Sequence, residues 1–96
     1  MAKKQIVKTN KVSACTPEKG FYVSDGSVYA SLADLAKGLR RMHPDTYQYH
    51  ANEQKNDFHN WIKDVFGDQK LAKQVLDARD QKQLSRIIYA GLKTRR

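Results

Sequence analysis

The sequence predicts a small, mainly α-helical (α+β) domain, with a short N-terminal β-hairpin followed by four to five short helices in a compact bundle. Asp25-Gly26 lies between two short runs rich in apolar and aromatic residues, which is the pattern of a tight hairpin. From residue 32 onward, apolar residues recur at helical spacing in several short segments. The chain has 96 residues, 40% of them hydrophobic, which is enough for one domain with one modest core.

The hairpin is expected over residues 21–23 and 28–30. A two-residue loop at Asp25-Gly26 would direct one face of the hairpin, built from two cross-strand pairs, toward the core. These pairs are Val23 with Val28 and Phe21 with Ala30. Tyr22 and Tyr29 would then oppose each other on the outer face.

The first helix is expected to begin at Ser31, because Asp34 follows three residues later in a variant of the capping box. Its apolar side chains recur at spacings of three and four: Leu32, Leu35, Leu39 and Met42. His43-Pro44 ends this helix, since a residue before proline disfavours the helical conformation. Residues 45–51 are expected to form a short second helix with Tyr47 and Ala51 facing inward.

Three further helices are predicted, each preceded by a capping residue: Asn56, Asp68 and Asp80. Gly67 can end the first of them in the left-handed conformation. Each helix has one apolar face. The three faces are Phe58, Trp61, Ile62, Val65 and Phe66; Leu71, Ala72, Val75 and Leu76; and Leu84, Ile87, Ile88 and Leu92.

The run YHANEQKNDFHNWIKDVFGD, from Tyr49 to Asp68, preceded by FYVSDGSVYASLADLAKGL, resembles a small, mainly archaeal and bacterial domain family of unknown function. The resemblance covers residues 21–75, follows the signature YHxNExKNDFxNWIxDVFGD, and implies a compact domain with a hairpin and helices. It implies no activity. Family members are more acidic than this chain, so any binding of a polyanion must be argued from the residues of this sequence.

Residues 1–19 are interpreted as a basic flexible tail and residues 20–96 as a single compact helical domain with a basic C-terminal helix. The net charge of +8 is concentrated at the two ends of the chain. Residues 1–19 and 80–96 each carry a net charge of +4, and the residues between them are neutral overall. Such an excess of cations favours a polyanionic partner.

The final helix contains the main candidate nucleic-acid-binding residues. At 100° per residue, its outward side chains fall within an arc of about 80°. They are Lys82, Arg86, Tyr89, Lys93 and Arg96. The cations can meet phosphates, and the tyrosine can donate a hydrogen bond or stack on an exposed base. The alternative is an ordinary solvated helix face, in which cations near the C-terminus interact favourably with the helix dipole.

Further cations near the two ends of the chain are assigned to the same candidate site: Arg95, Lys3, Lys4, Lys8 and Lys11. A flexible segment can follow phosphates without a fixed geometry, although many such tails only increase solubility. Arg40 and Arg41 on the first helix could extend a basic surface, but we interpret them as an ordinary solvated face.

A polar cluster precedes the Trp61 helix: His50, Asn52, Asn56 and His59. Its spacing places no two metal ligands on one helical face, so neither a metal nor acid–base catalysis is expected. We expect Asn52, Asn56 and Asp57 to bond backbone N–H groups at the bend, with His50 packed against them. A small ligand held by this cluster is the alternative.

The sequence thus predicts a non-enzymatic, cytoplasmic protein without a cofactor or small-molecule substrate, which binds DNA or RNA through the phosphate backbone and without sequence selectivity. Association with the nucleoid or ribosome would follow. The alternative is a protein-interaction or self-association module with an acidic partner, and a homodimer would bury further apolar surface. The single cysteine, Cys15, excludes an intrachain disulfide, and the apolar runs are too short to cross a bilayer.

Overall fold

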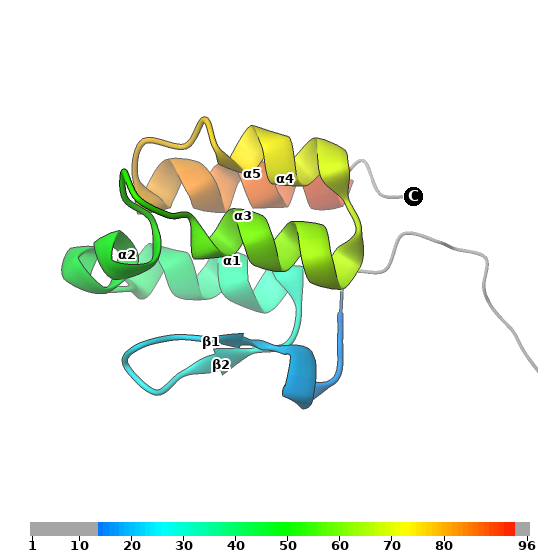
Figure 1. Ribbon diagram of the computed structural model, residues 1–96, viewed down its shortest axis with the longest axis horizontal. Coiled ribbons are helices and arrows are strands. Elements are labelled where there is room, and N and C mark those ends of the chain that lie inside the picture. Colours follow the sequence, from blue (N-terminus) through cyan, green and yellow to red (C-terminus); the bar gives the residue numbers. More distant parts are fainter. Residues whose placement is uncertain (1–13, 94–96) are drawn as a thin grey trace, which may run out of the picture.

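A two-stranded antiparallel hairpin and five α-helices make up the computed structural model, which describes residues 14–93 (Figure 1). The predicted fold class is confirmed. In chain order the elements are η2 (Pro17–Lys19), β1 (Phe21–Tyr22), β2 (Val28–Tyr29), α1 (Leu32–Arg41), α2 (Pro44–His50), α3 (Asp57–Trp61), η3 (Ile62–Phe66), α4 (Gln69–Val75) and α5 (Gln81–Lys93). None of the helices within residues 14–93 has the length and apolar character that crossing a membrane requires.

The predicted helix starts are confirmed by their capping hydrogen bonds. In each case a side-chain oxygen accepts from the backbone N–H three residues later, which satisfies a donor that has no partner inside the helix. The pairs are Ser31 with Asp34, Asn56 with His59, Asp68 with Leu71, and Asp80 with Gln83, at 2.8–3.0 Å. Gly67 has φ +65° and ends η3 in the left-handed conformation, as predicted.

The predicted register of the hairpin is wrong by one residue. Phe21 pairs with Tyr29 and Tyr22 with Val28, because the loop has three residues rather than two. The N–H of Gly26 bonds the carbonyl of Val23, and Gly26 adopts φ +99°, which is the geometry of a turn followed by a glycine bulge. Consequently Val28 is 43% exposed instead of belonging to the core face.

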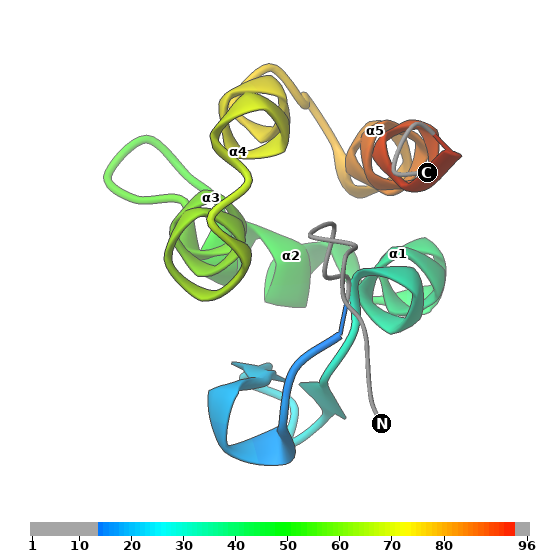
Figure 2. The ribbon, with the colours of Figure 1, turned by 90° about the vertical axis from the view of Figure 1, so that its right-hand side faces the viewer.

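The core is formed where the helices meet the hairpin. Phe58 is fully buried, and its ring stacks on Phe21 at 4.7 Å and on Tyr47 at 5.7 Å between centroids. Viewed end-on, α1 and α5 lie next to each other on one side of the molecule, with α3 and α4 on the other and the hairpin below (Figure 2). The largest fully buried aliphatic side chains of the α1–α5 pair are Leu32, Leu35, Leu39, Leu84 and Ile88.

Three further details differ from the predicted elements. The helix that starts at Asp57 continues as the π-helical segment η3 over its second half. Leu76 is 53% exposed, because α4 ends at Val75 and Leu76 begins the turn toward α5. The second helix covers Pro44–His50, which leaves Ala51 just beyond its end and half-buried, and buries His50 in place of Ala51.

Residues 14–19 contact the folded domain, although the predicted tail extended to residue 19. The N–H of Cys15 bonds the carbonyl of Ala30 at 2.7 Å, and the indole N–H of Trp61 bonds the carbonyl of Lys19 at 2.8 Å. Residues 1–13 lie outside the described residues. Cys15 is a free, half-buried thiol whose pKa is raised by burial.

Candidate functional site

Helix α5 is held antiparallel to α1 by side-chain hydrogen bonds to the α1 backbone. The side-chain N–H groups of Gln81 donate to the carbonyls of Leu39, at 2.9 Å, and Met42, at the C-terminal end of α1. One turn further along α5, the buried hydroxyl of Ser85 donates to the carbonyl of Ala36 at 2.7 Å. These bonds fix which faces of the two helices meet and which remain in solvent.

The predicted cations of α5 remain in solvent on one side of the helix. Lys82, Arg86 and Lys93 are exposed, and Tyr89, which lies between them in the sequence, is half-buried against the core. α5 contains no acidic residue. Within residues 14–93, every ion pair involves His43, His50 or Lys55, so the three α5 cations are not neutralised by carboxylates of the described chain.

The structure places cations of α1 beside this face. Lys37, Arg40 and Arg41 of α1 line a shallow hollow of about 420 Å³ together with Tyr89 of α5. All three cations are exposed, and none forms an ion pair within the described chain. We call the six cations of the two helices the basic surface: Lys37, Arg40, Arg41, Lys82, Arg86 and Lys93.

The carboxylate on α1 does not cancel this charge. Asp34 lies one turn before Lys37 and is exposed, but among residues 14–93 no lysine or arginine nitrogen lies within ion-pairing distance of it. Six cations, against Asp34 on α1 and Asp80 at the cap of α5, therefore give the α1–α5 edge an excess of positive charge. Unpaired cations on one surface repel one another, and a bound anion would relieve that repulsion.

Sequence reasoning found the α5 half of the basic surface and missed the α1 half. From the sequence, Arg40 and Arg41 are predicted to form an ordinary solvated face and Lys37 belongs to no predicted site, because nothing within α1 distinguishes this helix from other amphipathic helices. The pairing of α1 with α5 is the missing information. The remaining predicted site residues lie outside the described residues: Lys3, Lys4, Lys8, Lys11, Arg95 and Arg96.

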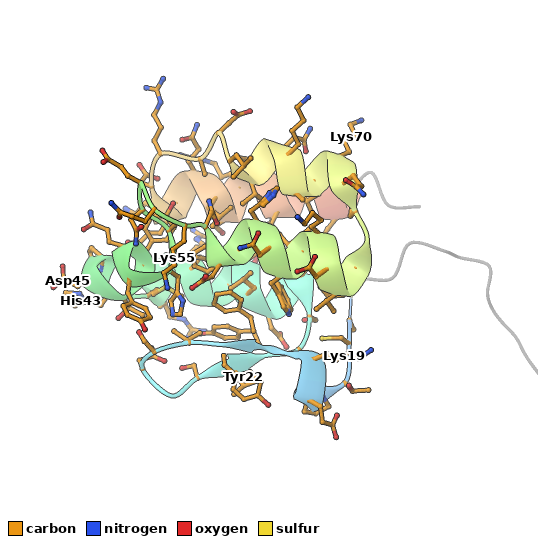
Figure 3. All side chains as sticks on the ribbon, viewed as in Figure 1. Lys19, Tyr22, His43, Asp45, Lys55 and Lys70 are labelled. Atoms are coloured by element: carbon orange, nitrogen blue, oxygen red, sulfur yellow. The ribbon has the colours of Figure 1, made fainter. Side chains whose placement is uncertain are left out.

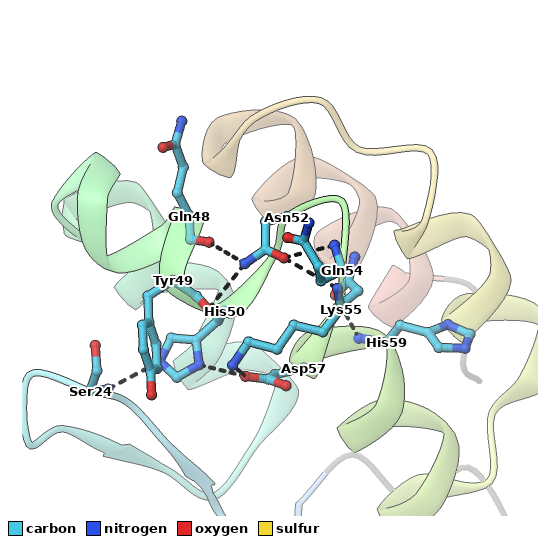
Figure 4. Close-up of polar contacts among 10 residues, drawn as sticks. Ser24, Gln48, Tyr49, His50, Asn52, Gln54, Lys55, Asp57 and His59 are labelled. Carbon is cyan, nitrogen blue, oxygen red and sulfur yellow. Dashed lines mark hydrogen bonds and ion pairs between the residues drawn. The ribbon is translucent and has the colours of Figure 1, made fainter.

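The polar cluster around His50 contrasts with the basic surface because its groups bond one another (Figure 4). The Ser24 N–H donates to Nε2 of His50 at 3.0 Å, so Nε2 is an acceptor and the neutral ring carries its hydrogen on Nδ1. That Nδ1–H donates to Asp57 at 2.9 Å, and Lys55 donates to the same oxygen at 3.0 Å. Both ring nitrogens are therefore engaged inside the protein.

The charge state of Asp57 follows from these contacts. Partial burial raises the pKa of the Asp57 carboxyl, but the hydrogen bonds from His50 and Lys55 and the charge of Lys55 outweigh burial. The net effect is a pKa below the ordinary value for aspartate, so the carboxylate is ionised at neutral pH. This network links the hairpin loop, α2 and the start of α3.

The other members of the cluster also have structural roles. Asn52 uses its whole amide: the oxygen accepts from the N–H groups of Gln54 and Lys55, and the nitrogen donates to the carbonyls of Gln48 and Tyr49. The Nδ1 of His59 donates to the carbonyl of Ala72 at 2.6 Å, which connects α3 to α4. Across residues 14–93, no three His, Cys, Asp or Glu side chains converge as metal ligands would.

A second, larger groove of about 800 Å³ lies between the loop that follows α2 and the corner between α4 and α5. Its lining combines the exposed Leu76 with amide groups and with both signs of charge, from Glu53, Lys55 and Arg79. Lys55 is already paired with Asp57. Unlike the basic surface, this groove therefore does not favour one sign of partner.

Comparisons with known proteins do not assign a function to the hollow between α1 and α5 or to the larger groove. No family model, curated protein or solved structure matches the chain. The resemblance of residues 21–75 to a bacterial and archaeal domain family stays a prediction. The geometry of the basic surface is therefore the main indication of function.

Proposed function

We propose that this protein binds nucleic acid through the phosphate backbone, without sequence selectivity, and that the basic surface makes the contact. The observation that supports this most is that Lys82, Arg86 and Lys93 share one exposed face of α5 and have no acidic partner within residues 14–93. The three cations of α1 lie beside that face. The proposal involves no catalytic step and no cofactor.

The dimensions of the basic surface suit a phosphate backbone. Lys82 and Lys93 are separated by about 16 Å along the axis of α5, at 1.5 Å per residue. A DNA duplex presents one charge per ~1.7 Å of its axis, so several phosphates fall within this span. We expect about 4 to 6 phosphates to be neutralised, which gives a slope of about −4 to −5 for log affinity against log salt concentration.

The pairing of α5 with α1 also argues for contacts that ignore sequence. Two helices side by side are about 20 Å wide, whereas the major groove of B-DNA is ~12 Å wide. The α1–α5 edge therefore fits across phosphates better than α5 fits into the groove as a recognition helix. Phosphate contacts carry no sequence information, so the proposal covers DNA and RNA alike.

The rival function is a protein-interaction or self-association module with an acidic partner. It requires an exposed apolar patch beside the cations. Within the described chain, the large apolar side chains with the highest exposure are Tyr22, Val28, Tyr49 and Leu76. They belong to the hairpin, α2 and the end of α4 rather than to α1 or α5, which favours nucleic acid over this rival.

The proposal places the protein in the cytoplasm, on the nucleoid or the ribosome. The basic residues outside the described range, at positions 3–11 and 95–96, would add charge to the same contact. A pull-down from native lysate with and without nuclease tests whether the partner is nucleic acid, because protein partners that remain bound after nuclease treatment would favour the rival function.

The decisive experiment measures affinity against salt concentration with the full chain and a labelled DNA duplex of about 20 base pairs. Replacing Lys82, Arg86 and Lys93 together by alanine should flatten the salt slope by ~2 to 3 units. The matched control replaces three exposed lysines of η3 and α4 by alanine: Lys63, Lys70 and Lys73. Lys70, for example, points away from the molecule at the outer edge of α4 (Figure 3).

The control removes the same net charge from a different face. A general effect of net charge would flatten the slope equally in both triple variants, and the assignment to the basic surface would then be wrong. An unchanged slope in the Lys82, Arg86 and Lys93 variant would also refute the assignment of the contact to the basic surface.

A further inference from the structure

We infer that the hollow between α1 and α5 holds one nucleotide of a single-stranded nucleic acid, with the base on the ring of Tyr89 and a phosphate among Lys37, Arg40 and Arg41. This inference rests on the proposed function and sharpens it, because it names the form of nucleic acid that the basic surface prefers.

The chemistry of the hollow matches the two parts of a nucleotide. Its lining consists of three cations and one aromatic ring, with no acidic residue. The hollow is shallow and open to solvent, with a volume of about 420 Å³. A nucleotide combines a flat aromatic base, which stacks on tyrosine, with a phosphate that pairs with lysine and arginine.

Tyr89 is distinguished from the more exposed tyrosines by its surroundings. Tyr22 and Tyr49 are 60% and 58% exposed, respectively. The hydroxyl of Tyr22 donates to the carbonyl of Pro17, and the Nζ of Lys55 covers the ring of Tyr49 at 4.4 Å from its centroid. By contrast, within residues 14–93 the hydroxyl of Tyr89 has no hydrogen-bond partner, and Tyr89 lines a hollow whose other three residues are cations without an ion pair.

The position of the ring selects for single strands. Tyr89 is half-buried between two helices, so a base must leave its own stack to reach the ring. The bases of a duplex are paired and stacked, and a duplex can offer only its phosphates to the rim of the hollow. In a flexible single strand, an unpaired base can enter without breaking a base pair. Stacking on an aromatic side chain then adds to the affinity of the strand.

The test compares a labelled oligothymidine of about 12 nucleotides with a duplex of equal length, both with the full chain at fixed salt concentration. Tyr89→Leu keeps apolar volume against the core but removes the aromatic face. We expect it to weaken binding of the single strand ~10-fold or more while duplex binding changes less than ~2-fold. Tyr89→Phe keeps the ring and should stay within ~2-fold of wild type for both probes.

Two controls use the exposed tyrosines: Tyr22→Leu and Tyr49→Leu should leave the single-strand affinity unchanged. A second measurement needs no substitution at all. Photo-cross-linking the wild-type chain to an oligonucleotide that contains 5-iodouracil should label Tyr89. Labelling of Tyr22 or Tyr49 in its place would overturn the inference, even if Tyr89→Leu failed to fold.

The outcomes separate the inference from the proposed function. If both probes bind equally and Tyr89→Leu has no effect, while the triple alanine variant still flattens the salt slope, the single-strand inference fails and the proposed function stands. If neither probe binds, both fail. A single-strand preference that Tyr89→Leu abolishes supports both.

Discussion

The His50 cluster and the basic surface are both rich in polar side chains, but they differ in where those side chains find their partners. In the His50 cluster, both imidazole nitrogens, both atoms of the Asn52 amide and the Asp57 carboxylate bond groups of the same chain. On the basic surface, none of the six cations forms an ion pair within the part of the chain that the structure describes. Polar groups that satisfy one another stabilise the fold, whereas a cluster of unpaired charges of one sign is available to a partner.

The largest effect that this comparison predicts is on stability at His50. His50→Ala would leave the Ser24 N–H without its acceptor and the Asp57 carboxylate without its imidazole donor, in a site where the His50 side chain is only 6% exposed. Losing a buried hydrogen-bonded group of this kind costs about 2 to 3 kcal/mol of unfolding free energy. Urea unfolding followed by Trp61 fluorescence measures it.

A matched control is His43→Ala. His43 is exposed, and its Nδ1 accepts one N–H, from Asp45, at the start of α2. Loss of this hydrogen bond should cost at most about 1 kcal/mol of unfolding free energy. Nucleic-acid affinity should be unchanged in both variants. If His50→Ala costs no more stability than His43→Ala, or if it weakens binding while the protein stays folded, the structural role assigned to the cluster is wrong.

A smaller effect is expected from pH, through Asp57. The hydrogen bonds from His50 and Lys55 lower the pKa of this carboxyl in the folded protein despite its partial burial. A group whose folded pKa is lowered contributes stability that is fully present above its unfolded pKa, about 3.9 for aspartate. That contribution is lost as pH falls through the lower, folded pKa.

The measurement is the unfolding free energy of wild type and Asp57→Asn between neutral pH and pH ~2. The difference between the two proteins should shrink below pH ~4 and vanish in acid, because protonated Asp57 has lost its charge-assisted bonds. A difference that stays constant over this range would show that the ionised carboxylate adds nothing to stability. Asp45→Asn, which removes an exposed carboxylate near His43, is the control.

What the sequence could predict depends on whether a feature is determined by neighbouring residues or by tertiary contacts. The helix caps at Ser31, Asn56, Asp68 and Asp80 depend on residues three apart, and all four predictions are confirmed. The hairpin register depended on loop length, and Asp25-Gly26 is compatible with both a two-residue loop and the observed three-residue loop with a bulge.

The candidate site divides in the same way. The cationic face of α5 follows from helical periodicity alone, so Lys82, Arg86, Tyr89 and Lys93 were assigned from the sequence. The contribution of Lys37, Arg40 and Arg41 depends on bonds that join residues about 40 to 50 positions apart, from Gln81 and Ser85 to the α1 backbone. No pattern within either helix encodes that pairing.

The smallest expected effect on stability, and the sharpest test of the comparison, is at the basic surface itself. Replacing Lys82, Arg86 and Lys93 together by alanine removes no hydrogen bond and no ion pair within the described chain. It relieves repulsion with the α1 cations, and alanine is at least as good a helix former as lysine or arginine. Loss of favourable interaction with the helix dipole, near Lys93, acts in the opposite direction.

These contributions nearly cancel, so the unfolding free energy should stay within about 0.5 kcal/mol of wild type, although the same variant flattens the salt slope of binding. Urea unfolding at low and high salt measures this change in unfolding free energy. Salt screens the repulsion between cations, so the stabilisation from its relief should be larger at low ionic strength. A loss of stability comparable to that of His50→Ala would mean that these cations hold the fold together. The contrast between the His50 cluster, whose polar groups bond one another, and the basic surface, whose cations are available to a partner, would then not hold.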